Sequence, residues 1–302
     1  MKQLLTSILT FYFRISCRSI QGINCNLTVI RLLYKLPTLH AYIDRLTYLF
    51  QKTCKSCYAR PVIKKVILKN GIRMYVDVTD RLGGLLYFYR SYSEPQTQAF
   101  ISARLGSGDI FVDVGANCGF YSLLAARKVE PSGKVYAFEP NPSVCEVFRR
   151  SITLNQLESV IALENCAVAE VSDKTLNFYL PSDGVNSAIG TIVADGVMAN
   201  HGNIDTSHYI SITSISLDDF FSHHQPAGKV FIKIDAEGAE EQVLKGMQGL
   251  LTRKVPYCII LESDSPESLA CKFINDCGYQ LVQTEIFNSS SHFGNYIFTL
   301  NH

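Results

Sequence analysis

The second part of the chain alternates short apolar runs with longer segments in which apolar residues recur at helical spacing. The runs predict strands at 110–114, 134–138, 160–165, 210–213, 229–234, 256–261, 279–284 and 295–300. The segments between them predict helices at 119–129, 142–155, 216–223, 239–250 and 266–277. Strands that alternate with helices form βαβ units, so we expect an α/β fold with a mainly parallel sheet covered on both faces.

The first part of the chain has a different pattern. Residues 62–80 read as two β-rich runs joined by Asn70-Gly71, a pair that suits a type I′ hairpin because both central residues need positive φ. Residues 27–50 place apolar side chains at helical spacing with bases between them, and Pro37 interrupts this pattern. We therefore expect one or two basic amphipathic helices in residues 1–60, a β-hairpin with a helical lead-in at 61–108, and a main domain at 109–302.

Charge is distributed unevenly along the 302 residues. The chain has 28 Lys and Arg against 27 Asp and Glu, but residues 1–65 hold eleven bases and a single acid, Asp44. A basic amphipathic segment can attach to an anionic membrane surface, or it can pack on the main domain as a helical lid with its bases in solvent. The first 19 residues lack a cleavage site and are interrupted by arginines too early to span a bilayer. We expect a cytoplasmic protein, with peripheral membrane contact as the open alternative.

Metal-binding patterns are weak in this sequence. Ten cysteines are scattered along the chain, and the pair Cys54 and Cys57 has no second pair at zinc-ribbon distance. Histidines do not stand at ligand spacing with carboxylates, although His208 and His292 could serve as bases. We expect reduced thiols and no metal.

Acidic residues stand at the ends of two predicted strands. Asp113 lies near the end of the first strand and is followed by Gly115 and Gly119, which allow a tight turn and a close approach of a ligand to the next helix. Glu139 ends the second strand, where an acid can accept hydrogen bonds from the two hydroxyls of a ribose. Ligands of such sheets bind beyond the carboxyl ends of the strands, so we expect the site there.

The glycine pattern argues against a dinucleotide. It lacks the G-x-G-x-x-G that brings pyrophosphate to a helix N-terminus, and Asp113 would repel phosphate. An adenosine that carries a positive group fits better, which describes S-adenosylmethionine.

Three segments, "FVDVGANCGFYSLLAA", "VYAFEPNPSVCEVFRRSITLN" and "VFIKIDAEGAEEQVLKGM", resemble the FkbM-type methyltransferases. The resemblance runs from about Glu94 to residue 262. It implies a Rossmann-like methyltransferase fold with a seven-stranded sheet, S-adenosylmethionine as cofactor, and methylation of hydroxyl groups.

The resemblance also implies which residues bind the cofactor. Those expected around its methionine part are Asp113, Gly115, Ala116, Asn117 and Gly119. Glu139 would bind the ribose, Pro140 and Asn141 would border the adenine, and Ala167 would lie at the adenine edge. Glu94 faces the cofactor's amino group or only caps the helix after Pro95. Asn155 has a cofactor role or is a helix C-cap.

The segment "KIDAEGAEE" places acids where the methyl group is transferred. Asp235 ends its strand, and Glu237 and Glu240 lead into the next helix. An alcohol must lose its proton to act as nucleophile, and a carboxylate can accept it. We expect Asp235 to be the base or to orient the acceptor, with Glu237 as the second candidate and Glu240 as a helix N-terminal charge. Alternatively, these acids only cap the helix and pair with Lys233, which is too costly to bury alone.

The predicted function is O-methylation of a small molecule or glycan. Residues 181–209 are rich in Gly, Asn and Ser and could cover the substrate or form an inert excursion. The alternatives are a nucleic-acid methyltransferase that uses the basic N-terminus, and an inactive cofactor-binding protein. The base-flipping motif Asn/Asp-Pro-Pro-Tyr/Phe is replaced by "DAEG" at Asp235, so we expect no nucleic-acid partner.

Overall fold

The computed structural model describes residues 12–33, 40–58, 60–181, 190–193, 207–288 and 290–300. Its contacts divide the chain into two compact units. The N-terminal unit consists of residues 1–92 with 181–188, and the sheet unit consists of residues 93–180 with 189–302. The expected three-part division at residues 60 and 108 stays a prediction.

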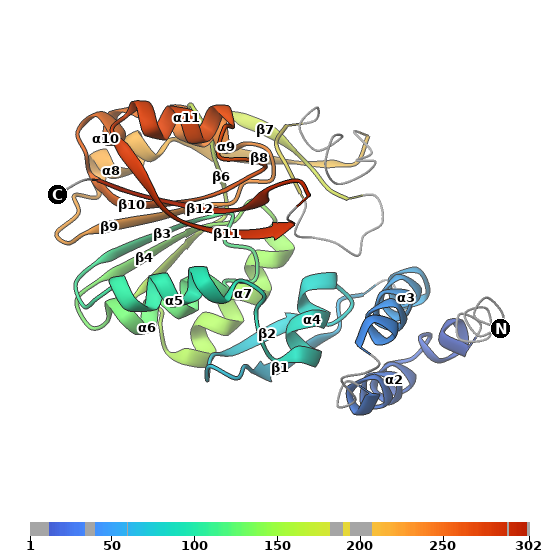
Figure 1. Ribbon diagram of the computed structural model, residues 1–302. Coiled ribbons are helices and arrows are strands. Elements are labelled where there is room, and N and C mark those ends of the chain that lie inside the picture. Colours follow the sequence, from blue (N-terminus) through green and yellow to red (C-terminus); the bar gives the residue numbers. More distant parts are fainter. Residues whose placement is uncertain are drawn as a thin grey trace. The chain divides into compact units, whose positions relative to one another are not determined.

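The N-terminal unit combines helices with a two-stranded antiparallel sheet (Figure 1). Its helices are α2 (Ile20–Leu33), α3 (His40–Tyr58) and α4 (Arg81–Tyr89), and its strands are β1 (Ile63–Ile67) and β2 (Arg73–Asp77). The expected hairpin and amphipathic helices are therefore present, while Pro37 lies outside the described residues. No helix in the described ranges is long and apolar enough to cross a bilayer.

The hairpin turn differs from the expected type I′ turn. Residues 68–72 separate the paired residues Ile67 and Arg73, and the Gly71 amide donates to the Leu68 carbonyl at 2.9 Å. Gly71 has φ 82°, whereas Asn70 does not have positive φ. The Asn70 Oδ1 instead accepts from the Ile72 amide at 3.2 Å. Asparagine thus forms a local turn through its side chain, and the prediction of positive φ at both positions was wrong.

Cys54 contacts a cysteine that is distant in the sequence. The Cys54 Sγ lies 3.0 Å from the Cys17 Sγ, and both residues are buried. The Asn26 Nδ2 also lies 3.6 Å from the Cys17 Sγ. Cys54 therefore belongs to the packed interior of this unit.

The sheet unit contains a seven-stranded sheet in the order β11-β12-β10-β9-β3-β4-β5. Five neighbouring strands, from β10 to β5, are parallel. At the other edge, β12 pairs antiparallel with both of its neighbours, β10 and β11. The strands are β3 (Ile110–Val114), β4 (Lys134–Phe138), β5 (Ile161–Glu164), β9 (Val230–Ile234), β10 (Pro256–Ser263), β11 (Tyr279–Asn288) and β12 (Phe293–Leu300). This confirms the α/β, Rossmann-like fold with a mainly parallel seven-stranded sheet.

Helices cover both faces of this sheet (Figure 1). One face carries α5 (Pro95–Arg104), α6 (Phe120–Val129) and α7 (Pro142–Asn155). The other carries α8 (Leu217–His223), α9 (Glu240–Lys245), α10 (Gln248–Thr252) and α11 (Leu269–Asp276). Side chains such as Val112, Phe220, Leu244 and Ile274 form a continuous apolar core on this second face. Burial on both faces explains the unbroken apolar runs of the central strands.

The chain order places a switch point beside β3. The chain forms β3, β4 and β5 outward in one direction and then returns to place β9 on the other side of β3. Parallel sheets of this kind bind ligands outside the carboxyl ends of the strands at such a point. The residues that follow β3, β4 and β9 therefore surround the expected site.

Two predicted elements differ in the structure. The strand expected at 210–213 lies in β8 (Tyr209–Ile215), which belongs to a separate three-stranded sheet with β6 (Ala167–Val168) and the unpredicted β7 (Thr175–Tyr179). The helix expected at 239–250 is split into α9 and α10 at Gly246. A Cβ at Gly246 would lie 2.1 Å from the Ala169 carbonyl oxygen, so this position requires glycine, a poor helix former. Much of the insertion at 181–209 lies outside the described residues.

Candidate active site

The turn after β3 brings two strand ends close together. Gly115 has φ 76°, and a Cβ there would lie 1.8 Å from the Asp235 carbonyl oxygen. The amides of Gly115 and Ala116 both donate to the Phe138 carbonyl at 3.0 Å, which ties this turn to the end of β4. Only glycine allows the backbone of the turn to approach the end of β9 this closely.

The turn continues through two further residues in the left-handed region. Asn117 has φ 49° and Gly119 has φ 82°. A Cβ at Gly119 would lie 2.1 Å from the Phe148 ring of α7. Gly119 is the N-cap of α6, so the helix starts directly beside the turn. The predicted residues 115–119 thus form one continuous backbone cradle at the switch point.

Glu139 lies against this cradle. Its Oε2 accepts from the Asn117 amide and its Oε1 accepts from the Asn141 amide, both at 2.8 Å. Burial raises the pKa of Glu139 to about 7, although the two backbone hydrogen bonds oppose this effect. Each carboxylate oxygen keeps a lone pair for a further donor. Asn141 caps α7 by accepting from the Ser143 amide at 3.0 Å.

Asp113 is a buried carboxylate within β3. Its Oδ2 accepts from the Ser122 hydroxyl of α6 at 2.6 Å. Burial raises its pKa, whereas the positive charge of Lys233, its register partner on β9, acts in the opposite direction. Asp113 and Lys233 are the charged residues in two strands that are otherwise apolar and buried.

Lys233 forms the expected ion pair with Asp235. Its Nζ lies 2.7 Å from the Asp235 Oδ2 and 5.0 Å from the centre of the Tyr121 ring. Burial alone would lower the pKa of Lys233, but Asp235, Glu94 and Asp113 outweigh it and raise the pKa. The prediction that Lys233 pairs with a nearby acid is confirmed.

Three carboxylates gather where β9 and β10 end. One oxygen from each of Asp235, Glu237 and Glu262 lies within 4.8 Å of the others. Burial, followed by the charge of Asp235, raises the pKa of Glu237 and of Glu262 well above the ordinary value. Such a group favours a positively charged ligand, because like charges this close cannot all ionise without one.

The Glu240 side chain accepts hydrogen bonds from backbone amides just before α9. Its Oε1 accepts from the amides of Ala236 and Gly238 at 3.0 and 3.1 Å. It stands in the first turn of α9, where a negative charge is favourable. This agrees with the helix-terminal charge expected for Glu240 and separates it from the carboxylate group.

Glu94 does not cap α5 with its side chain. Its Oε2 accepts from the Tyr121 hydroxyl at 2.5 Å and from the Asn295 Nδ2 at 2.8 Å. Glu285 is the residue that accepts from the Gln96 and Thr97 amides of α5, at 3.0 and 2.7 Å. Glu94 nevertheless stands at the N-cap position of α5, and its carbonyl accepts from the Gln98 amide at 3.1 Å, so it caps the helix through its backbone only. Its role toward a cofactor stays a prediction.

Ala167 and Asn155, two further residues expected near the cofactor, contact other parts of the protein. Ala167 is buried in an apolar cluster with Phe178 and Ile212. The Asn155 Nδ2 donates to the Ser151 carbonyl at 2.7 Å, while Gln156 is the C-cap of α7. The C-cap alternative for Asn155 is therefore wrong by one residue.

Sequence reasoning missed three residues near the strand ends. Glu262 is the penultimate residue of β10, as Asp113 is of β3, and this shared position was the signal that could have found it. The Asn165 Nδ2 donates to the carbonyls of Glu139 and Pro140, at 2.9 and 3.0 Å, and so fixes the end of β4. Asn295 lies opposite Glu262 on β12 and reaches Glu94.

The two reserve histidines each accept a hydrogen bond through the backbone carbonyl. The carbonyl of His208 accepts from the Leu180 amide at 3.1 Å, and the carbonyl of His292 accepts from the Tyr296 hydroxyl at 2.6 Å. Among the described residues, neither imidazole bonds to one of the site carboxylates.

Comparison with known proteins agrees with this geometry. The model of the methyltransferase FkbM domain matches residues 113–281, more than half of the chain. Methyltransferase sdnD of Sordaria araneosa is 28% identical over 163 residues, which cover 48% of this chain and 62% of the relative. The 31-O-demethyl-FK506 methyltransferase FkbM of Streptomyces tacrolimicus is 25% identical over 186 residues, covering 55% and 70%.

The chain is also similar to relatives whose names mention a hexuronic acid or a tRNA. The hexuronic acid methyltransferase AglP of Haloferax volcanii is 29% identical over 156 residues, which cover 50% of this chain and 55% of the relative. The matches extend to a tRNA (guanine(37)-N(1))-methyltransferase. The chain spans about 60% of the length of the first curated relatives it matches. The chain belongs to the FkbM methyltransferase domain family.

Proposed function

We propose that this protein transfers the methyl group of S-adenosylmethionine to a hydroxyl oxygen of a small molecule or glycan. The observation that carries the proposal is the gathering of Asp113, Glu139, Asp235, Glu237 and Glu262 at neighbouring strand ends beside the glycine cradle. The names of two relatives, which mention 31-O-demethyl-FK506 and a hexuronic acid, support an acceptor of this class.

The residues present fit the cofactor. Glycines at positions 115 and 119 let the cradle pack against the end of β9 and against α7, where a Cβ would meet neighbouring atoms at 1.8 and 2.1 Å, and so hold the cradle at the switch point. Glu139 has one free lone pair on each oxygen, which suits the two ribose hydroxyls. Asp113 and Glu262 supply negative charge for a sulfonium and an ammonium group.

S-adenosylmethionine supplies, when bound, a methyl group activated by its sulfonium. The chain must then align an acceptor oxygen and accept its proton. The ion pair with Lys233 stabilises the ionised form of Asp235, so we assign Asp235 to orienting the acceptor hydroxyl. Glu237 has a pKa raised well above the ordinary range and is the better proton acceptor.

Methylation of a nucleic acid is the second candidate. It is favoured by the basic N-terminal segment, in which residues 1–92 hold 15 Lys and Arg against three acids. A tRNA methyltransferase among the relatives agrees with it. An inactive cofactor-binding protein is the third possibility, and the set of acids at the strand ends argues against it.

Transfer of a radiolabelled methyl group tests the proposal. The wild type is incubated with labelled S-adenosylmethionine and with separate pools of macrolide alcohols, uronic-acid glycans and tRNA. We expect label in an alcohol or glycan pool, and we expect Asp235→Ala to bind the cofactor but to lose at least about 99% of the transfer. Glu158→Ala, an exposed acid of the same unit, is the control and should transfer normally. Label in tRNA alone would contradict the proposal.

A further inference from the structure

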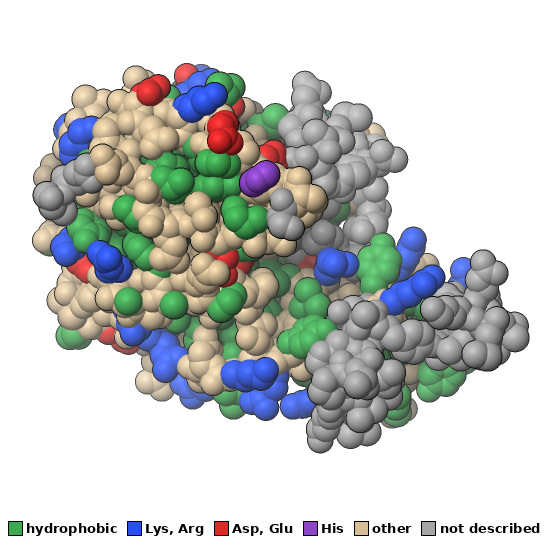
Figure 2. Space-filling model, viewed as in Figure 1, with side chains coloured by type: hydrophobic (Ala, Val, Ile, Leu, Met, Phe, Trp, Pro, Cys, Tyr) green, Lys and Arg blue, Asp and Glu red, His purple; other side chains and the backbone are tan. Residues whose placement is uncertain are grey.

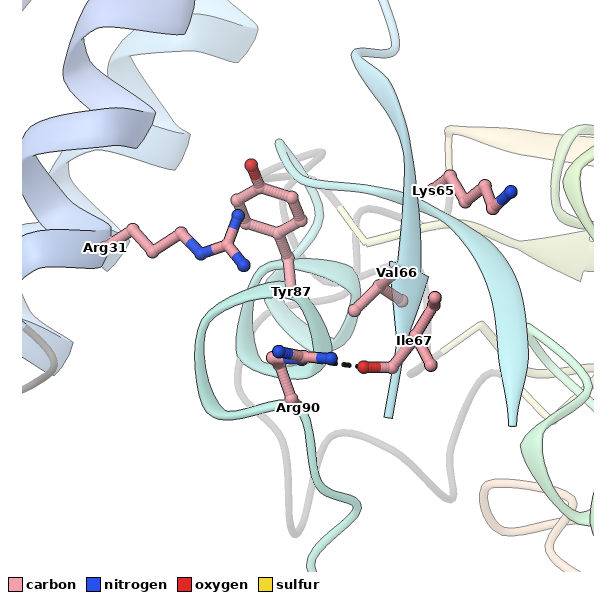
Figure 3. A pocket seen from close by; sticks show the side chains of 6 residues that line it. All are labelled: Arg31, Lys65, Val66, Ile67, Tyr87 and Arg90. Atoms are coloured by element: carbon pink, nitrogen blue, oxygen red, sulfur yellow. Dashed lines mark hydrogen bonds between the residues drawn. The ribbon is translucent and has the colours of Figure 1, made fainter. Parts of the chain in front are cut away.

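The N-terminal unit contains a pocket of about 310 Å³ that the proposed methyl transfer does not use. Arg31 of α2 and residues 65–67 of β1 line it, together with Tyr87 and Arg90 from the end of α4 (Figure 3). None of these six lining residues is acidic, and Arg31 and Arg90 are the basic side chains of the pocket, since that of Lys65 points away from them in Figure 3. The pocket therefore has the opposite charge from the site at the strand ends.

Described contacts hold both guanidinium groups at the pocket. The Cζ of Arg31 lies 5.5 Å from the centre of the Tyr87 ring, within the range of a cation–π contact. The Arg90 Nε donates to the Ile67 carbonyl at 2.7 Å (Figure 3). Arg90 has φ 54° and caps α4 by donating its amide to the Leu86 carbonyl. Part of the entropy that an arginine loses on binding is thus already lost in the folded chain.

The positive charge of this pocket has no protein counter-ion within the described part of the unit. Arg31 and Arg90 form no ion pair there. Asp77 accepts from the amides of Val62 and Thr79 and pairs with Lys55 at 3.4 Å. Lys and Arg side chains lie over β1 and β2 on the face shown in Figure 2.

The geometry suits a phosphate group that carries an organic part. Guanidinium forks match phosphate oxygens in a bidentate way. The Tyr87 ring and the Val66 side chain provide an apolar wall beside the cations. The volume is at the lower end of small-molecule pockets, so there is room for more than a bare ion. We propose that this pocket binds the phosphate of a phosphorylated organic molecule, either a lipid headgroup or a soluble phosphate ester.

Two binding measurements on the full chain test the proposal and separate the two sources. Calorimetry with glycerol 3-phosphate reports a soluble ester, and sedimentation with phosphatidylcholine vesicles, with and without phosphatidic acid, reports a lipid headgroup. Binding in either assay is expected to weaken at least about tenfold in the double variant Arg31→Gln/Arg90→Gln. The variant Arg31→Lys/Arg90→Lys keeps the charge but loses the forks, and an intermediate loss is expected.

The double variant Lys52→Gln/Arg81→Gln is the matched control. It removes the same charge from two exposed positions of this unit that do not line the pocket, and it should bind within about twofold of wild type. Thermal unfolding confirms that each variant is folded. Equal losses in the pocket and control variants would overturn the proposal, because they would indicate diffuse attraction. The absence of wild-type binding in both assays would also overturn it.

Discussion

Residues 1–92 and residues 93–302 carry opposite net charges. The first segment has 15 Lys and Arg against three Asp and Glu, which leaves 13 bases and 24 acids of the chain's 28 and 27 for the second. The overall charge of +1 therefore hides a net of +12 beside a net of −11. Each unit therefore suits a ligand of opposite charge, a phosphate in the N-terminal unit and a sulfonium in the sheet unit.

The two units also hold their charges differently. In the sheet unit, Asp113 and Glu139 are buried and the other acids at the strand ends are half-buried, beside the ion pair of Lys233 with Asp235. In the N-terminal unit, the bases of the pocket are exposed and solvated. Buried charges depend strongly on their partners, whereas exposed charges contribute little to stability. Substitutions in the sheet unit should therefore have the larger effects.

Gly115→Ala should have the largest effect. Alanine at φ 76° is strained, and its Cβ would meet the Asp235 carbonyl at 1.8 Å. We expect a loss of about 3 kcal/mol or more in the free energy of unfolding, measured by urea denaturation. Gly106→Ala is the control, because the nearest atom to its Cβ would be 3.7 Å away, and it should change stability little. Equal stabilities of the two variants would contradict the tight approach of the strand ends.

Lys233→Met should have the next largest effect. Without the ammonium, Asp235, Asp113 and Glu94 lose the positive charge that lowers their proton affinity. We expect the unfolding free energy to fall by about 3 kcal/mol at pH 8 and by less at pH 5, where these carboxyls take up protons. Lys52→Met, at an exposed position, should have little effect at either pH. A loss that does not depend on pH would count against this account.

The pH dependence of cofactor affinity follows from Glu139. Burial raises the pKa of Glu139 to about 7. Without cofactor, its carboxyl in the folded chain therefore keeps a proton at pH values where the unfolded chain has already released it. The bound proton stabilises the folded chain fully at pH values below the pKa that Glu139 has in the unfolded chain. This stabilisation is lost as the pH rises through about 7. Binding of ribose hydroxyls needs the ionised form, so affinity for S-adenosylmethionine should rise several-fold between pH 6 and pH 8. Titration calorimetry should show a flatter profile for Glu139→Gln, and a fall in wild-type affinity with pH would contradict the assignment.

The positions of many site residues followed from the sequence because they depend on local order along one strand. Asp113, Gly115 and Glu139 are each defined by a strand and the turn after it. Contacts between distant segments could not be predicted in this way. Asn295 reaches Glu94, and Glu285 caps α5, across most of the sheet unit. Glu262 was missed although it occupies the same position in β10 as Asp113, which was found, does in β3.

The smallest effect should come from the pocket of the N-terminal unit. Arg31→Gln/Arg90→Gln should leave the affinity for S-adenosylmethionine within about twofold of wild type, because exposed charges are screened by salt. Calorimetry at physiological ionic strength measures this. A larger change would mean that the charges of the N-terminal unit affect cofactor binding in the sheet unit, and would contradict the independence of the two units.

Calorimetric binding of S-adenosylmethionine to wild type and Glu139→Ala tests the central claim most directly. Glu139 accepts two backbone amides and offers its remaining lone pairs to the ribose, so its loss should weaken binding roughly hundredfold. Glu158→Ala, an exposed acid in the same unit, should bind as the wild type does. Equal affinity of Glu139→Ala and wild type would contradict the placement of the cofactor at these strand ends.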